Sequence, residues 1–189
     1  MPRGIVAEGP QSKYTVPAIH HIPSNKHIME SSSIAEFLES TYPNSPVPLT
    51  SALGQEILTK SRSAIGPVFH VSILPREIHI LPPRSREYFR RTREASLGHS
   101  LEEQLKKEED GEMWKAVDKS LPALGELIRT HKAEGPFVLG SRPSYADFTI
   151  AGSLQSARVV DERVFHRIGG VDGFRDVYEA CLPFMERDN

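Results

Sequence analysis

A carboxylate beside a hydroxyl, Glu30-Ser31, is the pair of side chains in this sequence best suited to hold a small zwitterion. A helical pattern of apolar residues, Ile34, Phe37 and Leu38, begins directly after the pair. The first backbone N–H groups of a helix have no partner within the helix, and they favour a bound anion. The carboxylate can therefore bind an ammonium group, while the hydroxyl and the N–H groups bind a carboxylate.

The elements that must position this pair are a hairpin and a short helix. Two β-type runs, Tyr14 to Ile19 and Lys26 to Met29, precede the helical pattern. Val16-Pro17 lies inside the first run, and because proline has no N–H for a ladder, it marks an edge or an entry point of the strand. We expect the helix to end near Tyr42, since three prolines follow within six residues. Simple helix capping is the alternative interpretation of Glu30-Ser31.

Val16-Pro17 followed at hairpin spacing by Glu30-Ser31 resembles the glutathione-binding half of the thioredoxin-like domain in glutathione S-transferases. The resemblance implies glutathione as the substrate and a cis peptide bond before Pro17. It also implies that the backbone N–H and C=O of Val16 bind the cysteinyl part of glutathione. By the same resemblance, Glu30 binds the γ-glutamyl ammonium group, and the Ser31 hydroxyl with nearby helix N–H groups binds the γ-glutamyl carboxylate.

A second motif, Pro143-Ser144-Tyr145-Ala146-Asp147-Phe148, predicts a capping box at the start of another helix. Ser144 would accept a hydrogen bond from the N–H of Asp147, and the Asp147 carboxylate would accept one from the N–H of Ser144. The motif resembles the capping box and hydrophobic staple of the central helix in the all-helical domain of glutathione transferases. Its implied role is folding, so neither side chain is expected in the site; Asp147 as a catalytic acid is the alternative.

The two motifs together predict a mainly α protein with two parts. Residues 1–48 are expected to form a partial thioredoxin-like α/β element, a β-hairpin plus a helix, and 49–189 the all-α glutathione transferase C-terminal domain. Pro83 to Glu94, together with Lys13 to Pro17 and Phe37 to Glu39, is similar to the fungal, etherase-like, serine-type branch of the family. That resemblance implies thiolate attack on a small hydrophobic or aromatic electrophile, with β-aryl ether cleavage as one form. The acceptor pocket is expected between the hairpin and the first helices of the C-terminal domain, near Ile65 to Phe69.

No residue of this sequence is predicted to activate the glutathione thiol. In the resembling family that residue belongs to a strand, helix and strand before the Val-Pro hairpin, and only about a dozen residues precede Tyr14. We therefore expect the chain to be truncated, through either a shortened gene model or a real loss. Ser12, Tyr14 and Ser24 carry hydroxyls near the expected site, but at positions that the family does not use. The alternative function is a non-catalytic remnant that binds glutathione or another ligand.

Charge and histidine content argue against nucleic-acid and metal sites. The net charge of −2 over 189 residues gives no electrostatic reason to expect a nucleic-acid partner. The run Arg84 to Arg93 has five arginines, and we interpret it as a solvated, ion-paired helix face rather than an RNA site. His20-His21 and His27 have no acidic partner at ligand spacing, so no metal is predicted.

The single cysteine is consistent with a reducing compartment, and the hydropathy pattern does not predict a membrane span. Cys181 alone excludes an internal disulfide, and we expect it to be a packed thiol rather than a nucleophile. No segment approaches the roughly 18 apolar residues that a membrane span requires. A cytoplasmic location is therefore the default expectation, and a homodimer is expected by resemblance alone.

Overall fold

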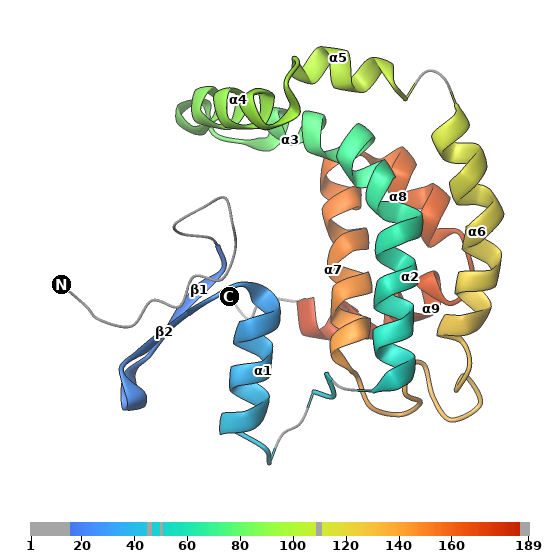
Figure 1. Ribbon diagram of the computed structural model, residues 1–189. Coiled ribbons are helices and arrows are strands. Elements are labelled where there is room, and N and C mark those ends of the chain that lie inside the picture. Colours follow the sequence, from blue (N-terminus) through green and yellow to red (C-terminus); the bar gives the residue numbers. More distant parts are fainter. Residues whose placement is uncertain (1–15, 45–46, 50, 109–110, 186–189) are drawn as a thin grey trace. The chain divides into compact units, whose positions relative to one another are not determined.

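The chain divides into two compact units, Met1–Leu49 and Thr50–Asn189. The computed structural model describes residues 16–44, 47–49, 51–108 and 111–185 (Figure 1). A two-stranded hairpin comes first along the chain, and helices make up most of the remaining described residues. This is the mainly α class, with an initial hairpin and helix, that the sequence predicts.

The hairpin of the first unit pairs β1 (Ala18–His21) with β2 (Lys26–Met29) in antiparallel register. One turn of 3-10 helix, Ile22–Ser24, connects the two strands. Asn25 closes this turn in the left-handed conformation, with φ of 49° and ψ of 39°, which asparagine tolerates better than most residues. The turn therefore fixes the register in which the two strands face each other.

Helix α1 (Ser31–Thr41) follows β2 after a single residue, Glu30. It ends before Tyr42, whose N–H donates to Leu38, and Pro43 prevents the helix from continuing. Both ends agree with the sequence-based expectation. α1 packs against both strands of the hairpin (Figure 1).

The second unit is a helical domain built around α7. Its helices are α2 (Ala52–Val68), α3 (Glu77–Ile80), α4 (Pro83–Leu97), α5 (Leu101–Lys106), α6 (Glu112–Ile128), α7 (Tyr145–Val160), α8 (Glu162–Gly169) and α9 (Phe174–Met185). α7 packs against α2, α8 and α9, and α2 packs in turn against α6 (Figure 1). A π-helical turn (Phe69–Ile73) and a 3-10 turn (Leu74–Arg76) connect α2 to α3.

The core of this unit lies between α2, α6, α7, α8 and α9. Five apolar residues of α6 recur at spacings of three and four and are all buried: Trp114, Val117, Leu121, Leu124 and Ile128. The inward side of α7 is buried at Ile150, Ala151, Leu154 and Ala157. Pro122 lies inside α6, which continues past it to Ile128.

The start of α7 is organised around the carboxylate of Asp147, which is fully buried. Its Oδ2 accepts hydrogen bonds from the N–H of Ser144 at 2.7 Å and from the Ser144 hydroxyl at 2.6 Å. The Ser144 side chain also faces the N–H of Asp147, which confirms the predicted capping box. Oδ1 accepts from the N–H of Val138 at 2.8 Å, so the same carboxylate also ties the preceding loop to the helix.

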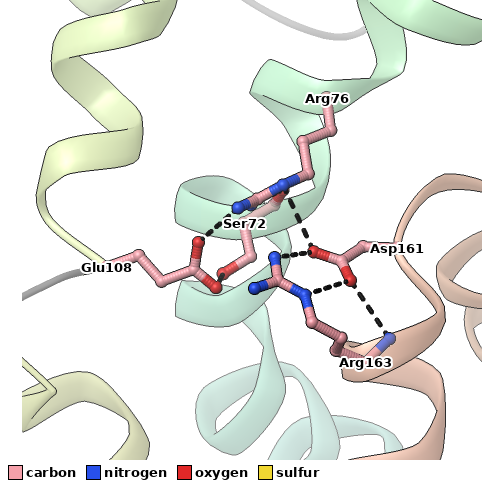
Figure 2. A network of polar contacts seen from close by, with 5 residues as sticks. All are labelled: Ser72, Arg76, Glu108, Asp161 and Arg163. Carbon is pink, nitrogen blue, oxygen red and sulfur yellow. Dashed lines mark hydrogen bonds and ion pairs between the residues drawn. The ribbon is translucent and has the colours of Figure 1, made fainter.

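A polar network joins three segments that are far apart in the sequence (Figure 2). The Arg76 guanidinium lies 2.7 Å from a Glu108 oxygen and 3.2 Å from Oδ2 of Asp161. Ser72 donates to the other Glu108 oxygen at 3.0 Å, and Arg163 binds both oxygens of Asp161. The network therefore fastens the turns after α2 to the end of α5 and to the start of α8.

The buried Asp147 carboxylate gives the first prediction. Replacing Asp147 with Ala leaves the N–H groups of Val138 and Ser144 buried without an acceptor, and should lower the free energy of unfolding by about 3–5 kcal/mol. Asp118→Asn is the matched control, because Asp118 pairs with Arg167 on the exposed surface, where ion pairs contribute at most about 1 kcal/mol. Urea unfolding of both variants measures the difference, and similar losses would contradict the role assigned to Asp147.

Asp161, one of the two carboxylates in the network of Figure 2, gives a second prediction. Burial disfavours the charged form of Asp161, but hydrogen bonds and charges from Arg163 and Arg76 outweigh it and hold the pKa of Asp161 below its ordinary value. A carboxyl with a lowered pKa stabilises the fold above its unfolded pKa of about 3.9, and this contribution disappears as the pH falls through the folded pKa.

The variant Asp161→Asn should therefore be less stable than the unaltered chain at pH 7, and the difference should shrink below about pH 4. Chemical unfolding at several pH values between 3 and 7 measures it. A stability difference that stays constant over this range would show that the charge of Asp161 does not stabilise the fold.

Candidate functional site

The hairpin register brings the four predicted site residues to one end of the hairpin. Ala18 pairs with Met29 at the start of β1 and the end of β2. Val16-Pro17 directly precedes Ala18, and Glu30-Ser31 directly follows Met29. The Ala18–Met29 pair is the last of the ladder at this end, and directly opposed residues of antiparallel strands have Cα atoms about 4.5–5.5 Å apart, so the two segments leave the hairpin from neighbouring points.

Val16 offers its backbone at this end of the hairpin. The residue is 93% exposed and precedes the paired part of β1, so its N–H and C=O lie outside the β1–β2 ladder. The peptide bond between Val16 and Pro17 is cis, as the family resemblance implies. An extended ligand can therefore hydrogen-bond to this backbone without displacing a strand.

Glu30 makes the whole connection between β2 and α1, and its backbone conformation is unusual. Its φ of 68° and ψ of 127° lie in a region that residues with a side chain rarely adopt, at a cost of about 1–3 kcal/mol. Such strained residues cluster at functional sites. The exposed Glu30 side chain makes no hydrogen bond to the start of α1, so its carboxylate is not used as a cap.

The start of α1 is open to an anion. Ser31, Ser32 and Ser33 form its first turn, and all three are exposed. Among the described residues, the first N–H of α1 with a hydrogen-bond partner is that of Ile34, which donates to the carbonyl oxygen of Glu30 at 2.9 Å. The earlier N–H groups carry the positive end of the helix dipole and favour a carboxylate. The corner therefore combines a carboxylate, a hydroxyl, helix N–H groups and a free strand backbone.

The other residues considered as nucleophiles or thiol activators are unsuited to that role or lie outside the described residues. Ser24 is in the turn between the strands, and its hydroxyl lies 2.6 Å from Nδ1 of His21. Ser12 and Tyr14 are outside the described residues. Cys181 is completely buried in the helical domain, and burial together with the nearby charge of Asp147 raises the pKa of its thiol to about 11.

The structure also bears on the arginine run, on metal binding and on membrane spans. Arg90 binds Glu94 and Glu102, as expected of an ion-paired helix face, and Arg91 lies over the ring of Tyr88. The described residues contain no group of three or more histidine, cysteine, aspartate or glutamate side chains placed to hold a metal ion. None of the helices in the described part of the chain combines the length and apolar character that a membrane span requires.

The acceptor pocket expected near Ile65 to Phe69 stays a prediction. Ile65 and Val68 are buried in the core of the helical domain. A groove of about 780 Å³ lies between α2 and α6, and Pro67, within the expected range, is one of the residues that line it. Small and apolar side chains such as Ala64, Pro67 and Ala123 line most of it.

Comparison with known proteins identifies the family. The model of the glutathione S-transferase C-terminal domain matches residues 55–175, which is more than half of the chain. The chain belongs to the glutathione S-transferase family. It is also similar to the glutathione S-transferase-like protein ustS of Aspergillus flavus, with 29% identity over 194 residues, 92% of this chain and 68% of that protein.

Two fungal crystal structures support the same assignment. Glutathione transferase GSTFuA3 of Phanerochaete chrysosporium has 27% identity and a TM-score of 0.75, covering 98% of this chain and 77% of that one. Glutathione S-transferase CsGST63524 of Ceriporiopsis subvermispora, solved in complex with glutathione, has 30% identity and a TM-score of 0.71, covering 100% and 78%. These neighbours confirm the predicted fold, a thioredoxin-like N-terminal element followed by the all-α transferase domain.

The environment of Cys181 gives a prediction for the glutathione transferase chain. A thiol with a pKa of about 11 is almost entirely protonated at neutral pH, and only the thiolate reacts readily. Cys181 in the folded chain should therefore resist Ellman's reagent at pH 7.5 and react fully once the chain is unfolded in guanidinium chloride. Immediate labelling of the folded chain would contradict the packed-thiol assignment.

Proposed function

We propose that this chain binds glutathione at the open end of its hairpin and presents the thiolate to a small hydrophobic or aromatic electrophile. The observation that carries the proposal is the common end of the hairpin, where the exposed backbone of Val16 and the uncapped start of α1 meet. Membership of the glutathione S-transferase family supports the choice of ligand. The proposal assigns glutathione binding to residues 1–48 and leaves 49–189 as the all-helical domain.

Each part of glutathione has a matching group in the proposed site. The N–H and C=O of Val16, next to Pro17, would bind the cysteinyl part in the way that a neighbouring strand would. The Glu30 carboxylate would bind the γ-glutamyl ammonium group. The Ser31 hydroxyl and the first N–H groups of α1 would hold the γ-glutamyl carboxylate, which the helix dipole also attracts.

The proposed reaction is a nucleophilic displacement. The glutathione sulfur, as the thiolate, forms a bond to the electrophilic carbon, and the bond from that carbon to the leaving group breaks, with the leaving group taking the electron pair. Cleavage of a β-aryl ether is the finer form of this proposal. It rests on the similarity of Pro83 to Glu94, Lys13 to Pro17 and Phe37 to Glu39 to the fungal etherase-like branch.

A non-catalytic glutathione-binding chain is the second candidate function. The observation in its favour is that no described residue is assigned as the thiol activator: Ser24 is hydrogen-bonded to His21, and Cys181 is buried. A free thiol has a pKa near 8.5, so at pH 7 only a few per cent is thiolate without an activating group. Binding without turnover would favour this second function over the first.

Family membership also supports a homodimer as the partner arrangement, since glutathione transferases commonly dimerise. The groove between α2 and α6 is an apolar surface that a second copy could cover. The cytoplasmic location stays a prediction from the sequence.

Calorimetric titration with glutathione tests the proposed site directly. Glu30→Gln removes the charge that pairs with the γ-glutamyl ammonium group and should weaken binding by about 10- to 100-fold. Ser31→Ala should weaken it by about 3- to 10-fold. Glu36→Gln is the matched control, because Glu36 is also exposed on α1 but lies beyond its first turn.

The expected control result is an unchanged affinity for Glu36→Gln. If Glu30→Gln and Glu36→Gln bind glutathione equally, the proposed role of Glu30 is wrong. Turnover of 1-chloro-2,4-dinitrobenzene by the unaltered chain, measured in parallel, separates the two candidate functions.

A further inference from the structure

His21 links the hairpin to the far end of α1. Its Nδ1 lies 2.6 Å from the Ser24 hydroxyl oxygen, and its Nε2 lies 2.8 Å from the Tyr42 hydroxyl oxygen. Tyr42 is the C-cap of α1, directly after its last residue, Thr41. Both ring nitrogens of His21 are thus engaged, one with the turn of the hairpin and the other with the helix terminus.

Aromatic contacts reinforce this link. The His21 ring meets the ring of Phe37 edge to face, with centroids 5.0 Å apart, and the ring of Tyr42 at 6.0 Å. Lys26, which pairs with His21 across the hairpin, also lies over the ring of Phe37, at 5.8 Å from its centroid. Polar and aromatic contacts therefore converge on one histidine, at the end of the hairpin opposite the proposed glutathione site.

The first unit has few other contacts that fix α1. Among its described residues only Met29 and Ile34 are buried apolar side chains. Met29 ends β2, and Ile34 lies in the first turns of α1, so both are near the start of the helix. The 11 residues of α1 extend over about 16 Å, so buried apolar side chains near its start alone leave the direction of the helix axis poorly determined. The contacts of His21 supply a second fixed point at the other end.

We propose that His21 is a positioning residue for the glutathione site, an inference that rests on the proposed function. It holds the end of α1 against the hairpin, and this keeps the Ser31 hydroxyl and the first N–H groups of α1 beside Val16 and Glu30. His21 does not touch the ligand, because it lies at the turn end of β1, about 10 Å along the strand from Ala18.

The adjacent histidine is a matched control for this role. His20 points to the other face of β1, where it stacks on His27 with centroids 4.1 Å apart and hydrogen-bonds to Asn25 at 3.0 Å. None of these partners belongs to α1. His20→Ala and His21→Ala therefore remove the same side chain from neighbouring positions, and only His21→Ala releases the helix.

The test measures the affinity of the full chain and its variants for two ligands, glutathione and the dipeptide Cys-Gly. Glutathione uses the start of α1 through its γ-glutamyl part, whereas the dipeptide Cys-Gly lacks that part and uses only the backbone of Val16. His21→Ala should weaken glutathione binding by about 5- to 10-fold and Cys-Gly binding by less than about twofold. His20→Ala should change neither affinity, and His21→Gln, which keeps a polar group to pair with the Tyr42 hydroxyl, should lose less glutathione affinity than His21→Ala.

A ligand-free measurement makes the role testable independently of affinity. Amide hydrogen exchange in α1 should be faster in His21→Ala than in His20→Ala, because the released helix opens more often. Three results for His21→Ala would each overturn the positioning role. They are an unchanged exchange rate in α1, an unchanged affinity for glutathione, and an equal loss of affinity for glutathione and for Cys-Gly. If the unaltered chain bound no glutathione, the proposed function and this role would fail together, whereas normal binding by His21→Ala would refute this role alone.

Discussion

The single-residue connection between β2 and α1 is the constraint on which the proposed site depends. A strand ends at Met29, a helix begins at Ser31, and the chain must change direction entirely within Glu30. With an extended backbone conformation at Glu30 the strand would continue, and α1 could begin only after further loop residues. The positive φ of Glu30 makes the sharp corner possible, and it sets the first N–H groups of α1 beside the hairpin end.

This corner needs supports that lie away from it, because the first unit is small. Its described part buries only two apolar side chains. Polar and aromatic contacts therefore contribute more to its structure than they do in a well-packed domain. The link from His21 to Tyr42 is the clearest of these contacts. The helical domain is different, since a continuous apolar core and a fully buried Asp147 fix its geometry.

Local signals in the sequence were sufficient for much of the fold. Ser144 and Asp147 predict a capping box because the pattern is confined to four residues, and the structure confirms it. The end of α1 follows from the prolines after Tyr42, and the buried face of α6 follows from its apolar spacing. In each case the physical cause lies within one or two helical turns of sequence.

Features that depend on distant segments could not be predicted in this way. The hydrogen bond from Val138 to Asp147 and the network of Arg76 with Glu108 and Asp161 join residues without any shared pattern. The same limit applies to Ile65 and Val68, whose burial in the core depends on which side of α2 faces the neighbouring helices.

The site itself was only partly predictable. The pairing of Val16-Pro17 with Glu30-Ser31 came from a family resemblance, and membership of the family is confirmed by the domain match. The strained conformation of Glu30 and the contacts of His21 could not be predicted from the sequence. No sequence pattern indicates a backbone angle at Glu30 or a contact between β1 and the end of α1.

The most direct test of the central claim is to follow the backbone amide resonances of the ¹⁵N-labelled chain during titration with glutathione. The account predicts that the amides of Val16, Glu30 and Ser31 to Ser33 shift together, along one saturation curve, while those of the core of the helical domain stay in place. Saturating shifts confined to the helical domain, with the amides of the hairpin corner unmoved, would contradict it.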